Sequence, residues 1–151
     1  MARIHHLNAT ERLHYQDQVI GLEGDVSYPL GDDFFRISHG SDYFRFFDRL
    51  GKVHYIVGLA PEGDRVIGAQ CFILRQIPTR LGDSRLSPVW YSCDTKVHPD
   101  HRKDGVGADL LKAYFGWSMA LNQLRHRCVL RGYGISMNSN TGQNRMKDHS
   151  K

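Results

Sequence analysis

Apolar residues recur along the chain with two different periods, and each change of period marks the border of a predicted element. Helical spacing over residues 9–23 and 43–50 predicts two helices, the first capped by Asn8 or Thr10. Residues 25–40 lie between them and are rich in glycine, proline and aspartate, so we expect this segment to be mostly loop.

Beyond residue 50 the apolar runs become short and continuous or alternating, as in strands. The predicted elements are strands at 52–59, 65–77 and 89–97, a helix at 105–123 and a strand at 128–137. A tight turn at 61–64 makes the first two strands antiparallel neighbours. The helical crossover makes the last two strands parallel, so the pattern predicts an α/β fold with a mixed sheet flanked by helices.

Length and composition favour one domain over residues 1–151, ending in a polar tail at 137–151 that could open another helix. The net charge of +4 suits an anionic ligand or only aids solubility, and the second reading carries more weight. The basic residues are spread out, so we expect no nucleic-acid partner. The cysteines are scattered, which is typical of a reducing compartment. The sequence also shows no apolar leader and no run near 20 apolar residues. These features predict a cytoplasmic protein without a membrane partner.

The strongest chemical signal is the turn Arg102-Lys103-Asp104-Gly105-Val106-Gly107, which joins a predicted strand to a predicted helix. Glycines let a ligand approach the backbone, and the first N–H groups of a helix attract anions. The turn is neither a Walker A loop nor a complete dinucleotide fingerprint. From composition alone, a phosphate cradle and a glycine-containing helix start with solvated charges are equally favoured.

The same residues carry a resemblance to a known family. Arg102-x-x-Gly105-x-Gly107 resembles the Arg/Gln-x-x-Gly-x-Gly/Ala signature of the GNAT superfamily of N-acetyltransferases, with a similar lead-in from Val97 and a following Leu110-Leu111 pair. The order of elements is also similar, from the first helix to the strand ending near Met137. The resemblance implies a GNAT-like fold and an N-acetyltransferase that uses acetyl-CoA as acyl donor, with an amine acceptor and no metal.

The resemblance also implies where the donor lies. Acyl-CoA would enter an opening between the strand ending at Val97 and the strand at 128–137, and the amine would attack the thioester directly. The pantetheine arm would pair with the backbone near Thr95, Lys96 and Val97, while an N–H near Val97 polarises the carbonyl. The implied pyrophosphate residues are Arg102, Lys103, Asp104, Gly105, Val106, Gly107 and Ala108, with Asn140 at the family's frequent asparagine.

Asp94 matches an acidic position common in the family, which makes it the candidate general base. An equally weighted alternative is a carboxylate that pairs with Lys96 or a nearby arginine. Regular strand alternation places Cys93 on the opposite face, where a small buried thiol is favoured over a nucleophile. His98 and His101 lack the further ligands of a metal site and are expected at the surface.

In one respect the sequence differs from the family it resembles. We expect the chain to end before the family's last helix and two strands, and to lack the tyrosine that often protonates the thiolate. Three explanations are open: a fragment, a second subunit that completes the sheet, or CoA binding without efficient turnover. An exposed sheet edge would favour a homodimer. An N-acyl amino acid or acyl-homoserine-lactone synthase and a non-catalytic acyl-CoA-binding module are the alternative functions.

Overall fold

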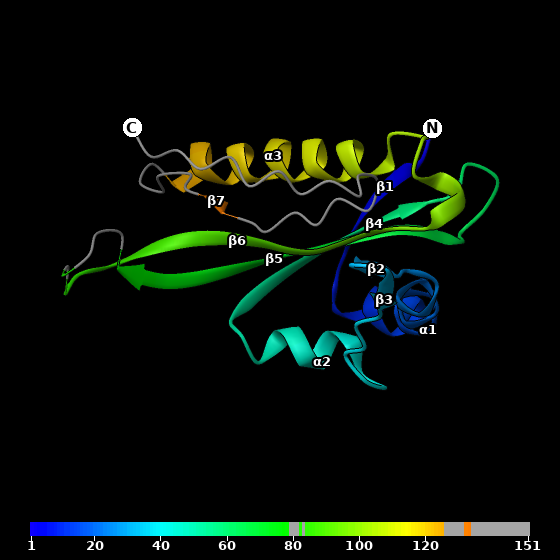
Figure 1. Cartoon of the computed structure of the whole chain (residues 1–151). Helices are drawn as coiled ribbons and strands as arrows, with labels where there is room; N and C mark the ends of the chain where they lie inside the picture. Colours follow the sequence, from blue (N-terminus) through cyan, green and yellow to red (C-terminus); the bar gives the residue numbers. More distant parts are fainter. Residues whose placement is uncertain (79–81, 83, 126–131, 134–151) are drawn as a thin grey trace, which may run out of the picture.

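The computed structural model describes residues 1–78, 82, 84–125, 132 and 133. Its elements, in chain order, are β1 (Arg3–Leu7), α1 (Ala9–Asp25), β2 (Tyr28–Leu30), β3 (Asp33–Phe35), α2 (Tyr43–Asp48), β4 (Lys52–Leu59), β5 (Val66–Pro78), β6 (Leu86–Val97), a short 3₁₀ helix (Pro99–His101), α3 (Val106–Arg125) and β7 (Gly132–Tyr133). One sheet, in the order β1-β4-β5-β6-β7, lies between two helical layers. Figure 1 shows α3 on one face of this sheet and α1 and α2 on the other.

The sheet confirms the predicted topology. β4 and β5 are antiparallel, while β6 and β7 are parallel and pair at Trp90 with Gly132 and Tyr91 with Tyr133. The rest of the predicted strand at 128–137 and the polar tail, with Asn140, lie outside the described residues. The α/β class with a mixed sheet is therefore correct, and helices flank both of its faces.

Two parts of the N-terminal half differ from the prediction. β1 pairs antiparallel with β4 but is absent from the predicted elements, because its polar residues Arg3, His5 and His6 break any apolar alternation. The segment predicted as loop contains β2 and β3, which form a small separate hairpin. β1 owes its order to a partner that is distant in sequence, and β2 and β3 owe theirs to the tight turn between them. None of the three has a strong apolar pattern of its own.

α1 begins as predicted at Asn8, whose side chain accepts from the N–H groups of Thr10 and Glu11 in a reciprocal capping box. Tyr15, Val19 and Leu22 of this helix enter the core under β4 and β5. Leu13 would belong to the same apolar stripe by its helical spacing, but it is 79% exposed and lies outside this core.

α3 packs on the other face of the sheet through Val106, Leu110 and Tyr114, as its spacing predicts. The Tyr114 ring stacks on Phe72 of β5 with centroids 3.5 Å apart. The neighbouring apolar residues Leu111 and Phe115 do not widen this stripe, because they are 41% and 45% exposed. Among the helices that the structure describes, none is both long and apolar enough to cross a membrane.

Close contact between α3 and β5 depends on Gly68. A Cβ atom at this position would lie 2.7 Å from Val106 Cγ1 and 3.2 Å from Leu110 Cδ1. We therefore expect Gly68→Ala to lower the free energy of unfolding by about 1–3 kcal/mol through overpacking. Gly21→Ala is the control, since nothing lies within 4 Å of its Cβ position in α1 and helix propensity predicts a gain of about 0.5–1 kcal/mol. Urea denaturation measures both, and an unaffected Gly68→Ala would contradict the packing.

A histidine pair also fixes α3 to the sheet. One ring nitrogen of His6 hydrogen-bonds to one of His54 at 2.8 Å, and the His54 ring stacks on Trp117 with centroids 3.6 Å apart. A hydrogen bond between two imidazoles needs at least one neutral ring. Burial, with a smaller contribution from neighbouring His6, lowers the pKa of His54 from its ordinary 6.5 to about 4.

The sign of the pH dependence follows from this lowered pKa. The unfolded chain protonates His54 near pH 6.5, whereas the folded state keeps it neutral down to about pH 4. Folding stability should therefore fall as the pH drops from about 6.5 to about 4. His54→Phe keeps a ring on Trp117 without titrating and should flatten this fall in urea denaturation, while the exposed His14→Phe should not. An equal slope in wild type and His54→Phe would refute the assignment.

Candidate functional site

β6 carries a bulge next to the centre of the sheet. Residues on either side pair normally with β5, but Asp94 and Thr95 together lie opposite Gln70. Asp94 has a φ of 54°, and it is the one non-glycine residue with positive φ in the described part of the chain. Such a conformation costs on the order of 1–3 kcal/mol and persists only where its surroundings hold it in place. Bulges of this kind change the direction in which side chains point.

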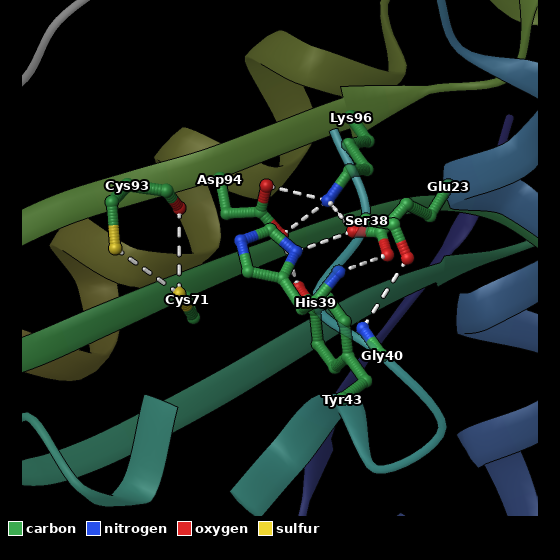
Figure 2. A network of polar contacts seen from close by, with 9 residues as sticks. All are labelled: Glu23, Ser38, His39, Gly40, Tyr43, Cys71, Cys93, Asp94 and Lys96. Carbon is green, nitrogen blue, oxygen red and sulfur yellow. Dashed lines mark hydrogen bonds and ion pairs between the residues drawn. The ribbon is translucent and has the colours of Figure 1, made fainter. Parts of the chain in front are cut away.

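The bulge reverses the alternation of β6. Cys93 packs against the core beneath α1 and α2, and Asp94 reaches the same side of the sheet, where it contacts Tyr43. The expectation that Asp94 and Cys93 lie on opposite faces is therefore wrong, because the extra residue breaks the two-residue period. Lys96 also faces this side, and Figure 2 shows the side chains of Asp94, Lys96 and Tyr43 meeting in one polar cluster.

Lys96 lies at the centre of that cluster. Its Nζ donates to both carboxylate oxygens of Asp94 at 2.5 Å and to Glu23 Oε1 at 2.9 Å. The Lys96 side chain is fully buried and that of Glu23 is 3% exposed. Burial of these charges is tolerable only because each has a partner of opposite sign.

Both buried partners remain charged at neutral pH. Burial alone would lower the pKa of Lys96, but the neighbouring Asp94 and Glu23 carboxylates outweigh it and raise that pKa. Burial would likewise raise the pKa of Glu23, but hydrogen bonds from His39 and Lys96 outweigh it and lower that pKa. The cluster is thus a network of ions, with each charge stabilised by its neighbours.

His39 and Tyr43 complete the cluster from the loop and helix that follow α1. Glu23 accepts from the backbone N–H of His39 at 2.8 Å and contacts its ring Nδ1 at 2.5 Å. Tyr43 donates its hydroxyl to Asp94 Oδ2 at 2.5 Å, and burial, with the nearby Asp94 charge, raises the pKa of this phenol well above its ordinary range. The phenol therefore stays protonated as a donor.

Glu23, His39 and Asp94 are also residue types that bind metals, and one ligand atom of each lies within 4.8 Å of the others. However, the Lys96 ammonium already contacts both carboxylates and supplies the positive charge that a metal would bring. The pairing of Asp94 with Lys96 that the sequence suggests is confirmed. Sequence reasoning missed Glu23 and His39, although a glutamate on the buried stripe of α1 is a signal that could have found the first.

The glycine turn follows directly after β6. Gly105 has a φ of 78°, and its carbonyl accepts from the N–H of Asp109 at 3.0 Å, so α3 begins at Val106. The N–H groups of Arg102 and Asp104 already donate to carbonyls of the preceding 3₁₀ turn. Of the N–H groups expected to hold an anion, those of the first turn of α3 are thus the best placed, since a helix gives them no internal acceptor.

The other predicted donor residues lie along the same path. Thr95, Lys103 and Ala108 are exposed, while Val97 packs its side chain against the core under α3. The Lys96 side chain points into the charge cluster, so only its backbone can face a donor. Within the described residues, β7 pairs with β6 only at Trp90 and Tyr91. The structure thus separates the residues predicted to hold the donor from a charge cluster on the α1–α2 side of the same strand.

Cys93 does not behave as an isolated nucleophile. Its Sγ lies 3.2 Å from Sγ of Cys71, which is directly opposite on β5. Burial, followed by the hydrogen bond to Cys93, raises the pKa of the Cys71 thiol well above its ordinary value. These contacts agree with the expected small, packed thiol at position 93.

Removal of the central ammonium tests the cluster. Lys96→Met leaves two buried carboxylates without a counter-charge and should lower the free energy of unfolding by about 3–5 kcal/mol. The deficit should shrink as the pH falls toward about 4, because a protonated carboxyl group needs no cation. Lys112→Met removes an exposed lysine 3.5 Å from Asp109 and should change stability by less than about 0.5 kcal/mol. Equal urea midpoints for the two variants would contradict a buried ion network.

Comparison with known proteins yields no matching family model. An uncharacterized protein of Acanthamoeba polyphaga mimivirus is 31% identical over 77 residues, which is 50% of this chain and 22% of that protein. The chain therefore matches only about a fifth of the length of this curated relative.

The similarity to solved structures covers more of the chain. A GNAT family acetyltransferase of Staphylococcus aureus is 16% identical, with 99% of this chain and 97% of that chain covered and a TM-score of 0.57. A Trypanosoma brucei acetyltransferase is 17% identical, with 90% and 83% covered and a TM-score of 0.56. An aminoglycoside N-acetyltransferase solved with CoA is 18% identical, with 90% and 77% covered and a TM-score of 0.56. The chain therefore has the fold of the GNAT acetyltransferases.

Proposed function

We propose that the chain is a CoA-dependent N-acyltransferase that moves an acetyl group from acetyl-CoA to a primary amine by direct attack. The observation that carries the proposal is the arrangement of a bulged strand, β6, that leads through a Gly105-x-Gly107 turn into the N-terminus of α3. Fold alone does not decide function, so the argument rests on what each half of this arrangement can do.

The donor half suits a CoA thioester. The first turn of α3 presents backbone N–H groups and the positive end of a helix dipole, which favour a pyrophosphate. Arg102 and Lys103 bring positive charge to the same turn. The backbone of β6 near Thr95 and Val97 would pair with the pantetheine amides, and an N–H there would stabilise the oxyanion.

The acceptor half suits an amine. Asp94 and Glu23 contribute two carboxylates and Lys96 one ammonium, so this region carries a surplus of negative charge when His39 is neutral. A surplus of negative charge attracts a cationic amine to the strand that would hold the thioester. Asp94 remains the carboxylate that we propose next to the reacting atoms. It acts there together with Lys96 and Tyr43, which both donate hydrogen bonds to it.

Turnover is tested by release of free CoA thiol from acetyl-CoA with a panel of small primary amines, polyamines and amino sugars. Amine-dependent thiol release with a matching acetylated product supports the proposal. Binding of acetyl-CoA without thiol release for any amine would make the chain an acyl-CoA-binding module instead. Faster release from long-chain acyl-CoA than from acetyl-CoA would point to a synthase of N-acylated amino acids or lactones.

The donor site has its own test by calorimetry with acetyl-CoA. Gly107 is the best position, because a Cβ there would only reach ordinary contact with Val97 Cγ2 at 3.6 Å, whereas Gly105 needs its positive φ. Gly107→Glu places a carboxylate in the anion-binding turn and should weaken binding by about tenfold or more. Arg102→Ala should weaken it in the same direction.

Gly116→Glu is the matched control, since it adds the same charge to an open position farther along α3. It should leave the affinity for acetyl-CoA within about twofold of wild type. If Gly107→Glu and Arg102→Ala bind acetyl-CoA as tightly as this control, the assignment of the turn to the pyrophosphate is wrong.

A further inference from the structure

Asp94 is poorly placed to take a proton by itself. Its Oδ1 accepts from Lys96, and its Oδ2 accepts from both Lys96 and Tyr43. Three donors thus fill most of the roughly four lone-pair sites of the carboxylate. Because the buried ammonium also neutralises its charge, this carboxylate is poorly suited to take a further proton.

His39, by contrast, has one nitrogen fixed and one available. Glu23 is ionised and can only accept, so the ring Nδ1 at 2.5 Å must carry the hydrogen. The lone pair is therefore on Nε2, and no described residue hydrogen-bonds to that atom. Figure 2 shows this second ring nitrogen pointing away from Glu23. The His39 side chain is 10% exposed, so the ring is not sealed from solvent.

The position of the ring is determined by its neighbours. A ring nitrogen of His39 lies within 4.8 Å of an Asp94 carboxylate oxygen, so one amine could contact both residues. The groups that face the ring are Glu23 from α1, Tyr43, Phe46 and Phe47 from α2, and Asp94 with its partner Lys96 from β6. The aromatic rings restrict the imidazole, and the hydrogen bond to Glu23 fixes its orientation.

We propose that His39 is the general base of the acyl transfer, with Glu23 as the residue that positions it; the inference rests on the proposed N-acyltransferase function. The neutral amine attacks the thioester carbon, and a C–N bond forms. His39 Nε2 takes one proton from the amine nitrogen. The C–S bond then breaks, and the imidazolium returns that proton to the CoA thiolate, so amine and acetyl-CoA yield amide and CoA with no other reactant.

The first test measures the tautomer of His39 without any substrate. Nitrogen-15 NMR of the full chain near pH 8, assigned with His39→Gln, should show the proton on Nδ1. Glu23→Gln removes the ionised acceptor and should shift the ring toward the Nε2–H form that free histidine prefers. The exposed His14 is the internal reference and should not respond to Glu23→Gln. A wild-type His39 that carries its proton on Nε2 would overturn the proposal.

The second test uses an amine that the wild type acetylates. His39→Gln keeps an amide donor for Glu23 and should lower kcat by roughly 10²–10⁴-fold with little change in KM for acetyl-CoA. The acid limb of the kcat/KM profile should vanish in His39→Gln and persist in Asp94→Asn. Free imidazole should restore part of the rate of His39→Ala, and His14→Gln should behave as wild type.

The outcomes separate the two proposals. A wild type that binds acetyl-CoA but acetylates no amine defeats the proposed function and the catalytic role with it. A wild type that acetylates an amine while His39→Gln does so equally well defeats only the role of His39. An acid limb that persists in His39→Gln and disappears in Asp94→Asn would assign the base to Asp94 instead.

Discussion

The buried ammonium of Lys96 is the interaction on which the α1–α2 side of the sheet, the proposed acceptor side, depends. It holds Asp94 of the bulge and Glu23 of α1 at once, and Glu23 in turn holds the backbone and the ring of His39. One cation thereby ties the sheet, the first helix and the loop before α2 to one point. The bulge makes this possible, because regular alternation from Cys93 would turn Lys96 toward α3.

Stability alone is a weak reason for such a cluster. A buried ion pair seldom stabilises a fold more than apolar residues of the same volume would, because each charge loses its hydration. The positive φ of Asp94 adds a further local cost, and it occurs at the residue that contacts both Lys96 and Tyr43. Strain and buried charge coincide at this one residue, on the strand that leads into the glycine turn. Chemistry at that point explains this coincidence better than folding does.

The two halves of the candidate site differ in how well the sequence predicts them. The turn from Arg102 to Gly107 is contiguous, so its glycines, charges and helix start are visible without any knowledge of the fold. The charge cluster joins residues up to 73 positions apart, and only their partners give them a role. The bulge that collects them has no sequence signal, since an aspartate in a strand gives no indication of a positive φ. β1 was missed for a related reason, because its order comes from pairing with β4 and not from its own pattern.

A histidine that takes the amine proton also bears on how the thiolate leaves. Direct attack leaves a proton to be lost from the amine nitrogen and produces a thiolate. A single group that takes the proton from nitrogen and gives it to the thiolate therefore balances the reaction. With Nδ1 held by an ionised glutamate, His39 can alternate between its neutral and charged forms while its orientation stays fixed. Lys96 maintains this arrangement from the other side, because it keeps Glu23 ionised and Asp94 paired through both states of the imidazole. On this view Asp94 and Lys96 set the charge of the site, and the proton moves on the histidine beside them.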